Sequence, residues 1–210
     1  MKMLIAFAAF ALAGCTVVEQ PSGLIPRWTT SWRQAASLDD QARLHDWRKS
    51  FVEAVAAANK ANAADVAREG VLLQPDAALG FKPLANGMYR CRVIKLGAKG
   101  ETNLAYVAYP AFACRVRPER SIQRLTKLSG SQRYVGLLFP PDGIRQVFLG
   151  TLALGDERRA MQYGEDSGRD VAGFVERIGP DRWRLIMPKP HFESQLDVME
   201  LTPASDGTRS

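Results

Sequence analysis

The sequence is poor in the side chains on which most enzyme chemistry depends. It contains two histidines, His45 and His191, and three cysteines, none of them in a Cys-x-x-Cys pair. A zinc site draws its ligands from Cys, His and carboxylates at recognisable spacings, and nucleophilic catalysis needs a base beside Ser or Cys. Neither pattern stands out, and the glycines lack the strand-to-helix context of a phosphate-binding loop. We therefore expect no metal and no cofactor, and we assign no catalytic residue.

A long apolar run and a lysine cluster are also missing. The apolar run at residues 4–13 is about half as long as the roughly 20 residues that a membrane-spanning helix needs. The formal net charge of +6 is mild and lacks the clustering typical of nucleic-acid binding. The composition argues against a nucleic-acid partner and leaves open an attraction to anionic lipid headgroups or lipopolysaccharide phosphate.

What the sequence does contain is an export signal. Lys2 precedes the apolar run, which ends in Leu12-Ala13-Gly14-Cys15. This arrangement resembles the signal peptide and lipobox of bacterial lipoproteins. The resemblance implies that residues 1–14 are cleaved off and that Cys15 carries the lipid, with acyl chains such as palmitate. The alternative is a plain signal peptide with an incidental cysteine.

The residues after Cys15 suit a lipid anchor. Several acyl chains hold a protein stably on a membrane, whereas one binds only marginally. Residue 16 is Thr rather than Asp, which by resemblance to lipoprotein sorting favours the outer membrane, facing the periplasm. Pro21, Gly23 and Pro26 make residues 15–36 a tether, and residues 204–210 are expected to form a flexible tail. The membrane is thus the first predicted partner.

With Cys15 assigned to the lipid, Cys91 and Cys114 remain as a pair in an oxidising compartment. Each lies in a strand-like run where arginines take the opposite face. Two thiols on facing inner surfaces predict a disulfide. A metal site or a redox-active thiol pair is the alternative, for which few further ligands exist.

Residues 37–80 predict the helical part of a single domain that runs to residue 203. Ser37 is a suitable N-cap, and apolar residues recur at three-and-four spacing from Leu44 to Ala58. A break is expected near Asn59–Asn62, and Gly70 fits a C-terminal cap.

Residues 84–203 predict short antiparallel strands joined by Pro, Gly and Asp turns. No helix long enough for a parallel crossover intervenes. The fold class is therefore α+β, with a helical segment followed by a barrel-like, lipocalin-like or curved-sandwich domain of about eight strands. Gly87-Met88-Tyr89 is similar to the Gly-x-Trp start of lipocalin-like barrels. The predicted strands are 88–96, 103–109, 112–117, 121–128, 133–139, 145–154, 171–178, 182–187 and 195–202.

Several longer strings are specific, among them residues 89–97, 127–133, 148–157 and 190–194. Together they resemble the domain-of-unknown-function family 4893, from about Trp32 to Pro203. The resemblance implies one domain that includes the helical part. It implies no activity, substrate or catalytic residue.

Six residues are candidates for ligand contact. His191 and Glu193 would share a face of an extended run, although the same stretch also fits a polar loop. Many arginines lie on or beside strands, and those that converge would bind carboxylate, phosphate or sugar acid groups, whereas separate ones would only face solvent. The candidates are Tyr89, Arg90, Arg115, Trp183, His191 and Glu193.

Three functions compete. The first is a lipid-anchored envelope module that binds a ligand or a protein, and it ranks above an envelope hydrolase or transferase using His191 and nearby acids. A purely structural role in the envelope ranks third. Fold alone does not decide among them.

Overall fold

The computed structural model describes residues 29–100, 105–155 and 157–204. The predicted signal peptide, Cys15 and the tail from residue 205 lie outside these ranges. The helices are α1 (Trp32–Ala35), α2 (Leu38–His45), α3 (Trp47–Arg68) and the 3-10 helix η1 (Gly70–Leu73). The strands are β1 (Gly87–Ala98), β2 (Tyr106–Ala108), β3 (Phe112–Glu119), β4 (Ile122–Lys127), β5 (Gln132–Asp142), β6 (Arg145–Leu154), β7 (Asp170–Gly179), β8 (Arg182–Pro188) and β9 (Ser194–Pro203).

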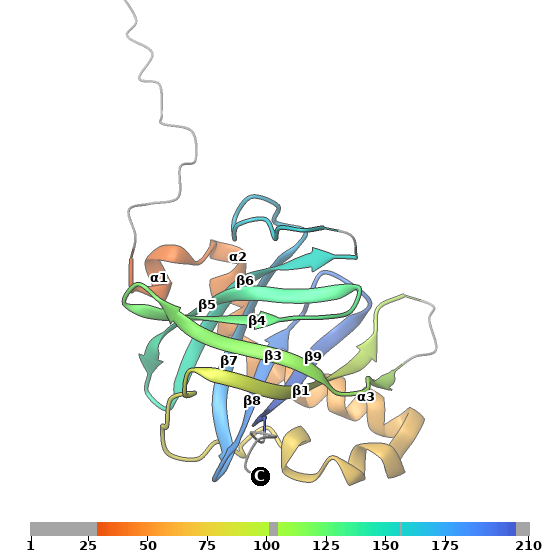
Figure 1. Cartoon of the computed structure of the whole chain (residues 1–210). Coiled ribbons are helices and arrows are strands. Elements are labelled where there is room, and N and C mark those ends of the chain that lie inside the picture. Colours follow the sequence, from red (N-terminus) through yellow and green to blue (C-terminus); the bar gives the residue numbers. More distant parts are fainter. Residues whose placement is uncertain (1–28, 101–104, 156, 205–210) are drawn as a thin grey trace, which may run out of the picture.

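The strands form a closed antiparallel barrel of eight strands with β2 as an additional short strand (Figure 1). β1 pairs with both β2 and β3, each strand from β3 onward pairs with the next along the chain, and pairing of β9 with β1 closes the ring. β3 pairs with Gly87–Cys91 of β1 and β2 with Ile94–Leu96, so β2 and β3 lie along the same edge of β1. The predicted barrel-like fold is confirmed, and the closed ring decides for the barrel over the curved sandwich.

Side chains fill the barrel interior. Alternate residues of the eight barrel strands point inward, as the period of two requires, and form one buried apolar cluster. Gly136 and Gly150 face each other on β5 and β6, and a Cβ atom on either would lie within 2.7 Å of the Phe148 ring. Only glycine lets the ring lie across this pair. The interior is thus a packed core rather than a carrier cavity.

The two ends of the barrel differ. We call the end at the β3–β4, β5–β6 and β7–β8 turns the closed end, because residues 74–86 cross it and insert Leu84, which is 1% exposed, into the core. We call the other end, at the β4–β5, β6–β7 and β8–β9 connections, the mouth. Polar side chains gather there.

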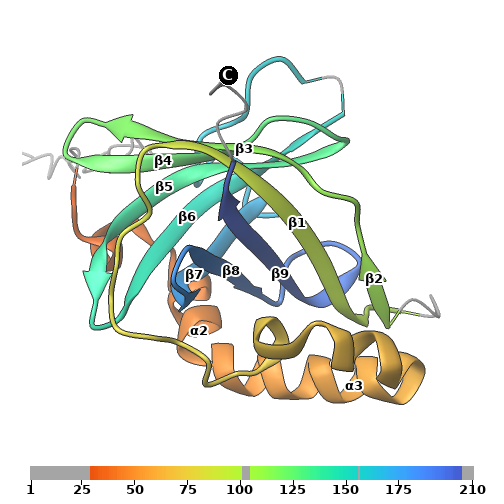
Figure 2. The ribbon, with the colours of Figure 1, turned by 60° about the horizontal axis from the view of Figure 1, so that its bottom comes forward.

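The helices pack on one side of the barrel. α3 lies against β1, β8 and β9, and α2 against β7 (Figure 2). We call this the covered wall. None of the described helices makes its main contacts with β3, β4 or the part of β5 near the mouth, which we call the bare wall. The helical part therefore packs across a side of the barrel rather than across one of its ends.

Single residues of the helical part explain where its helices begin and where they break. The Ser37 side chain caps α2 by accepting from the Asp40 amide, and the expected break appears at Asn62, whose φ and ψ are not helical. A further break at Asp46 turns the chain, so that Leu44 packs beside β6 and β7 while Phe51 packs on β8 and β9. α1 lies within the segment expected to be tether, because Trp32 packs against the barrel.

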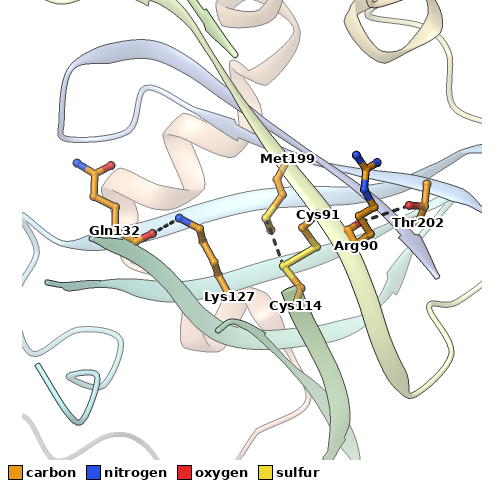
Figure 3. The surroundings of a disulfide bond; sticks show 7 residues. All are labelled: Arg90, Cys91, Cys114, Lys127, Gln132, Met199 and Thr202. Atoms are coloured by element: carbon orange, nitrogen blue, oxygen red, sulfur yellow. Dashed lines mark hydrogen bonds between the residues drawn. A yellow bond between two sulfur atoms is a disulfide. The ribbon is translucent and has the colours of Figure 1, made fainter. Parts of the chain in front are cut away.

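Cys91 and Cys114 lie at disulfide distance inside the barrel, with Cα atoms 6.0 Å apart. Both are buried, and the Cys114 sulfur lies 4.0 Å from the Met199 sulfur (Figure 3). The bond joins β1 to β3 and thus the covered wall to the bare wall.

Candidate anion-binding site

Arginines on the bare wall converge on one groove. Outward positions of β3, β4 and β5 carry Arg117, Arg124 and Arg133, and the β6–β7 connection adds Arg158. The groove has a volume of about 280 Å³, close to the lower limit of small-molecule sites. Its lining consists of Arg117, Arg124, Thr126, Lys127, Leu128, Arg133, Val135, Ala153, Glu157, Arg158 and Ala160.

The pairing of β3 with β4 places two arginines directly opposite each other. Arg117 faces Arg124 in the register, and like charges at such positions are unfavourable. Glu119 relieves this in part, since its Oε2 atom lies 2.9 Å from Nε of Arg124 and 3.8 Å from a nitrogen of Arg117. The hydrogen bond from Arg124 lowers the pKa of Glu119. One carboxylate therefore serves two guanidinium groups.

The other side of the groove is fixed by backbone acceptors. Arg133 donates to the carbonyl oxygens of Gly155 at 2.8 Å and Glu157 at 2.6 Å, and so ties the β6–β7 connection to β5. The Glu157 carboxylate is held by Arg169, whose hydrogen bond lowers the pKa of Glu157. Arg158 is exposed and has no ion-pair or hydrogen-bond partner among the described residues. The groove thus presents more cationic donors than acidic acceptors.

Lys127 connects the groove to the mouth. Its Nζ atom donates to the Gln132 carbonyl at 2.5 Å and lies 4.4 Å from the centre of the Phe112 ring. Figure 3 shows Lys127 and Gln132 side by side. Burial lowers the pKa of Lys127, and the charges of Lys95 and Arg133 add to this effect. The positive charges of Lys127, Lys95 and Arg133 repel one another, and a bound anion would relieve this repulsion.

The mouth holds an inward-facing lysine. Lys95 Nζ lies 2.6 Å from Oε2 of Glu193 and donates to Oε1 of Gln132 at 2.8 Å. The Lys95 side chain is 7% exposed, while Glu193 reaches solvent. Beside them is a cavity of about 10 Å³, lined in part by His191 and close to the least that one water molecule needs.

Behind Lys95 lies a buried hydrogen-bond network. Tyr134 donates to Oδ2 of Asp197 at 2.6 Å, and Ser194 donates to Oδ1 of the same carboxylate. Burial raises the pKa of Asp197 and of Tyr134, so Tyr134 stays protonated as a donor at neutral pH. This network satisfies the polar groups at the inner end of the mouth.

The six predicted contact residues fall into three places. Tyr89 and Trp183 meet edge-on at the closed end, 6.4 Å between ring centres, and donate to the carbonyl groups of Ala85 and Lys82. Arg90 and Arg115 are exposed on outer strand faces and do not line the groove. His191 and Glu193 lie at the mouth near Lys95. Partial burial, then Arg43 and Lys99, lower the pKa of His191.

Several site residues escaped the sequence-based prediction. The alternation that points Cys91 inward also points Lys95 inward, so that signal was present in the sequence. The opposition of Arg117 and Arg124 follows from the short turn between β3 and β4. Lys127 follows Arg124 on the same strand, whereas Arg158 joins them through the β6–β7 connection, which no local pattern reveals.

Comparisons with known proteins place the chain in a family. Residues 32–201, from α1 to β9, match the family described as Domain of unknown function (DUF4893). The chain belongs to the DUF4893 family. No curated protein and no solved structure matches it. Any function of this DUF4893 domain must therefore be argued from its geometry.

The described part of the DUF4893 domain was compared with the requirements of a metal site and of a membrane-spanning helix. Within the described ranges, no three His, Cys, Asp or Glu side chains gather as a metal site would require. No helix in the described part of the chain is long and apolar enough to cross a membrane.

Proposed function

We propose that the protein is a lipid-anchored envelope protein that binds the phosphate groups of anionic membrane lipids through the basic groove of the bare wall. The observation that carries this proposal is the groove itself. Its lining has five cationic side chains and one carboxylate, and Arg169 already holds that carboxylate.

Phosphate fits the donors of the groove. The planar guanidinium presents parallel N–H donors that match two phosphate oxygens, and Arg117 and Arg124 offer two such groups side by side. Their mutual repulsion is unfavourable for the empty protein and is relieved by an anion between them. A lipid headgroup also needs no enclosed pocket, in agreement with an open groove and a filled barrel.

The proposed location in the cell envelope supports an anionic lipid as the partner. The lipobox-like Leu12-Ala13-Gly14-Cys15 favours an acylated Cys15, and Thr16 favours the outer membrane, facing the periplasm. A chain from Cys15 to Thr29 can extend at most about 50 Å. That reach lets the bare wall approach the headgroups of the anchoring membrane.

The test uses vesicles and a protein without acyl chains, the Cys15→Ser variant. We expect binding to vesicles of phosphatidylcholine with phosphatidylglycerol and little binding to phosphatidylcholine alone, with affinity falling as salt rises. Adding Arg117→Ser and Arg124→Ser should weaken binding about tenfold. Flotation of vesicle-bound protein measures it.

The matched control removes the same charge elsewhere. Arg90→Ser with Arg115→Ser alters two exposed arginines outside the groove and should leave most of the affinity intact. An equal loss in both double variants would mean that net charge, not the groove, attracts the vesicle. Equal binding to neutral vesicles would overturn the proposal.

The anchor has its own test. Palmitate supplied to cells should label the unaltered chain and not the Cys15→Ala variant. Label retained after this substitution would contradict acylation at Cys15.

A hydrolase or transferase using His191 has weaker support. A catalytic imidazole is normally oriented by a hydrogen bond to a second group. Within the described part of the chain, His191 has no such partner, because Glu193 is engaged with Lys95 and Gln132. We therefore prefer binding over catalysis.

A further inference from the structure

The connection between β8 and β9, residues 189–193, covers the mouth and carries its own carboxylate. We call it the mouth loop. Pro190, His191 and Phe192 line the small cavity, and Glu193 reaches inward to Lys95. The inward-facing ammonium group is thus paired directly with an acid on a solvent-exposed loop, in addition to Asp197 opposite it on β9. An acid on a loop can leave with that loop.

The interior of the mouth would be ready for another carboxylate. Without Glu193, Lys95 would keep the Gln132 amide as a neighbour. Asp197, opposite Lys95 in the register, interacts with the Lys95 charge and also accepts from Tyr134 and Ser194. Lys95 lies close enough for its charge to lower the pKa of Lys127. Two lysines would then face the single carboxyl group of Asp197, and this local balance would favour an incoming anion.

The backbone of the mouth loop is strained at both ends. Lys189 and Glu193 have φ values of 46° and 58°, a left-handed conformation that residues other than glycine rarely adopt. The Ser194 amide donates to the Phe192 carbonyl at 2.6 Å, which closes a tight three-residue turn around Glu193. Strain of this kind persists where surrounding contacts impose it, and it gathers at sites that bind or switch.

We propose that the mouth loop is a lid over a second, interior anion site, in which Lys95 binds the carboxylate of a small ligand after Glu193 swings out. In the closed structure Glu193 takes the position of the ligand carboxylate. The site goes beyond the groove, which binds headgroups on the outer wall.

The packing sets the size of the ligand. Behind Lys95 the barrel is filled, and the adjoining cavity has room for about one water molecule. A ligand that replaces the Glu193 carboxylate and that water is the size of acetate or propionate. Larger acids would need the core to move.

The test is acetate binding by the full chain carrying Cys15→Ser, followed by amide NMR shifts at constant ionic strength. In the closed state Glu193 competes from within the chain, at an effective concentration in the millimolar range or above. Glu193→Gln should therefore tighten acetate binding about tenfold or more and speed hydrogen exchange at the Ser194 and Lys99 amides, which donate to the Phe192 and Glu193 carbonyl groups. Asp39→Asn, which removes one exposed acid from α2, should leave both readouts unchanged.

Substitutions of Lys95 test whether acetate binds at the mouth. In the Glu193→Gln background, Lys95→Met should abolish acetate binding, and Lys95→Arg, which keeps a cation and guards against a folding defect, should retain it. The lid is overturned if Glu193→Gln binds acetate no more tightly than the parent, or if Lys95→Met keeps the binding. Arg117→Ser with Arg124→Ser should not change acetate binding, so this result and the vesicle result can fail independently.

Discussion

The two walls of the barrel use arginine in different ways. On the covered wall Arg184 is fully buried beneath η1 and donates to Glu176 and to the carbonyl groups of Leu72 at 2.7 Å and Pro75 at 3.1 Å. On the bare wall Arg117 and Arg124 face each other and share Glu119. The residue type is the same, but Arg184 has acceptors within the protein for all of its nitrogens, whereas Arg117 and Arg124 share one carboxylate.

This difference separates structural arginines from those available to a ligand. A buried guanidinium must have its acceptors within the protein, because leaving it unpaired costs several kcal/mol. A partly exposed one can exchange water for a phosphate. The surplus of donors on the bare wall thus marks the wall that an anion would complete.

The largest expected effect comes from the covered wall. Arg184→Ala leaves Glu176 buried with only Arg145 and opens a gap beneath η1, so the free energy of unfolding should fall by about 3–5 kcal/mol. Urea denaturation measures it. Arg117→Ala is the counterpart on the bare wall and should change stability by about 0.5 kcal/mol or less. Equal losses from both changes would remove the distinction between the walls.

The next effect concerns the bond that joins the walls. Replacing Cys91 and Cys114 with alanine removes a cross-link between two residues that are 23 positions apart in the sequence. In the chain-entropy description this should lower the free energy of unfolding by about 3 kcal/mol. Reductant should lower the stability of the unaltered chain toward that of the double variant. Free alkylation of both thiols in folded protein without reductant would contradict the bond.

Much of this architecture is predictable because it is local. Alternation predicts nine strands. Gly143 and Pro180-Asp181 lie at hairpin turns, while Pro140, Pro141 and Asp142, which resemble turn residues in the sequence, continue β5 up to its turn. Ser37 caps its helix and Asn62 interrupts one, since capping and helix propensity act over a few residues.

The site is less predictable because it depends on closure of the barrel. The bend at Asp46 contains no Pro or Gly that would predict it. It arises because Leu44 and Phe51 both pack on the curved outer wall of the barrel, in two different clusters. Trp183, a predicted ligand contact, instead packs at the closed end, where residues 74–86 reach across to it. Contacts between segments so far apart in the sequence produce no periodic pattern of residues from which they could be predicted.

A smaller effect should appear on the bare wall alone. Arg117→Ser relieves the repulsion with Arg124, so stability should hold or rise by a few tenths of a kcal/mol while vesicle binding weakens. Denaturation and flotation on the same preparation separate the two results. A clear loss of stability would show that Arg117 supports the fold and would make its effect on binding uninformative.

The smallest effect tests the shared acid of the bare wall. The pKa of Glu119 is lowered mainly by the Arg124 hydrogen bond, so its stabilising effect is present above the ordinary glutamate pKa and is lost as the pH falls through the lowered one. Glu119→Gln should therefore reduce stability slightly at neutral pH, by about 0.5 kcal/mol or less, and the gap should vanish in acid. The same change frees donors of Arg117 and Arg124, so vesicle binding should tighten a few-fold. Weaker binding would mean that Glu119 positions the arginines for the ligand instead of competing with it.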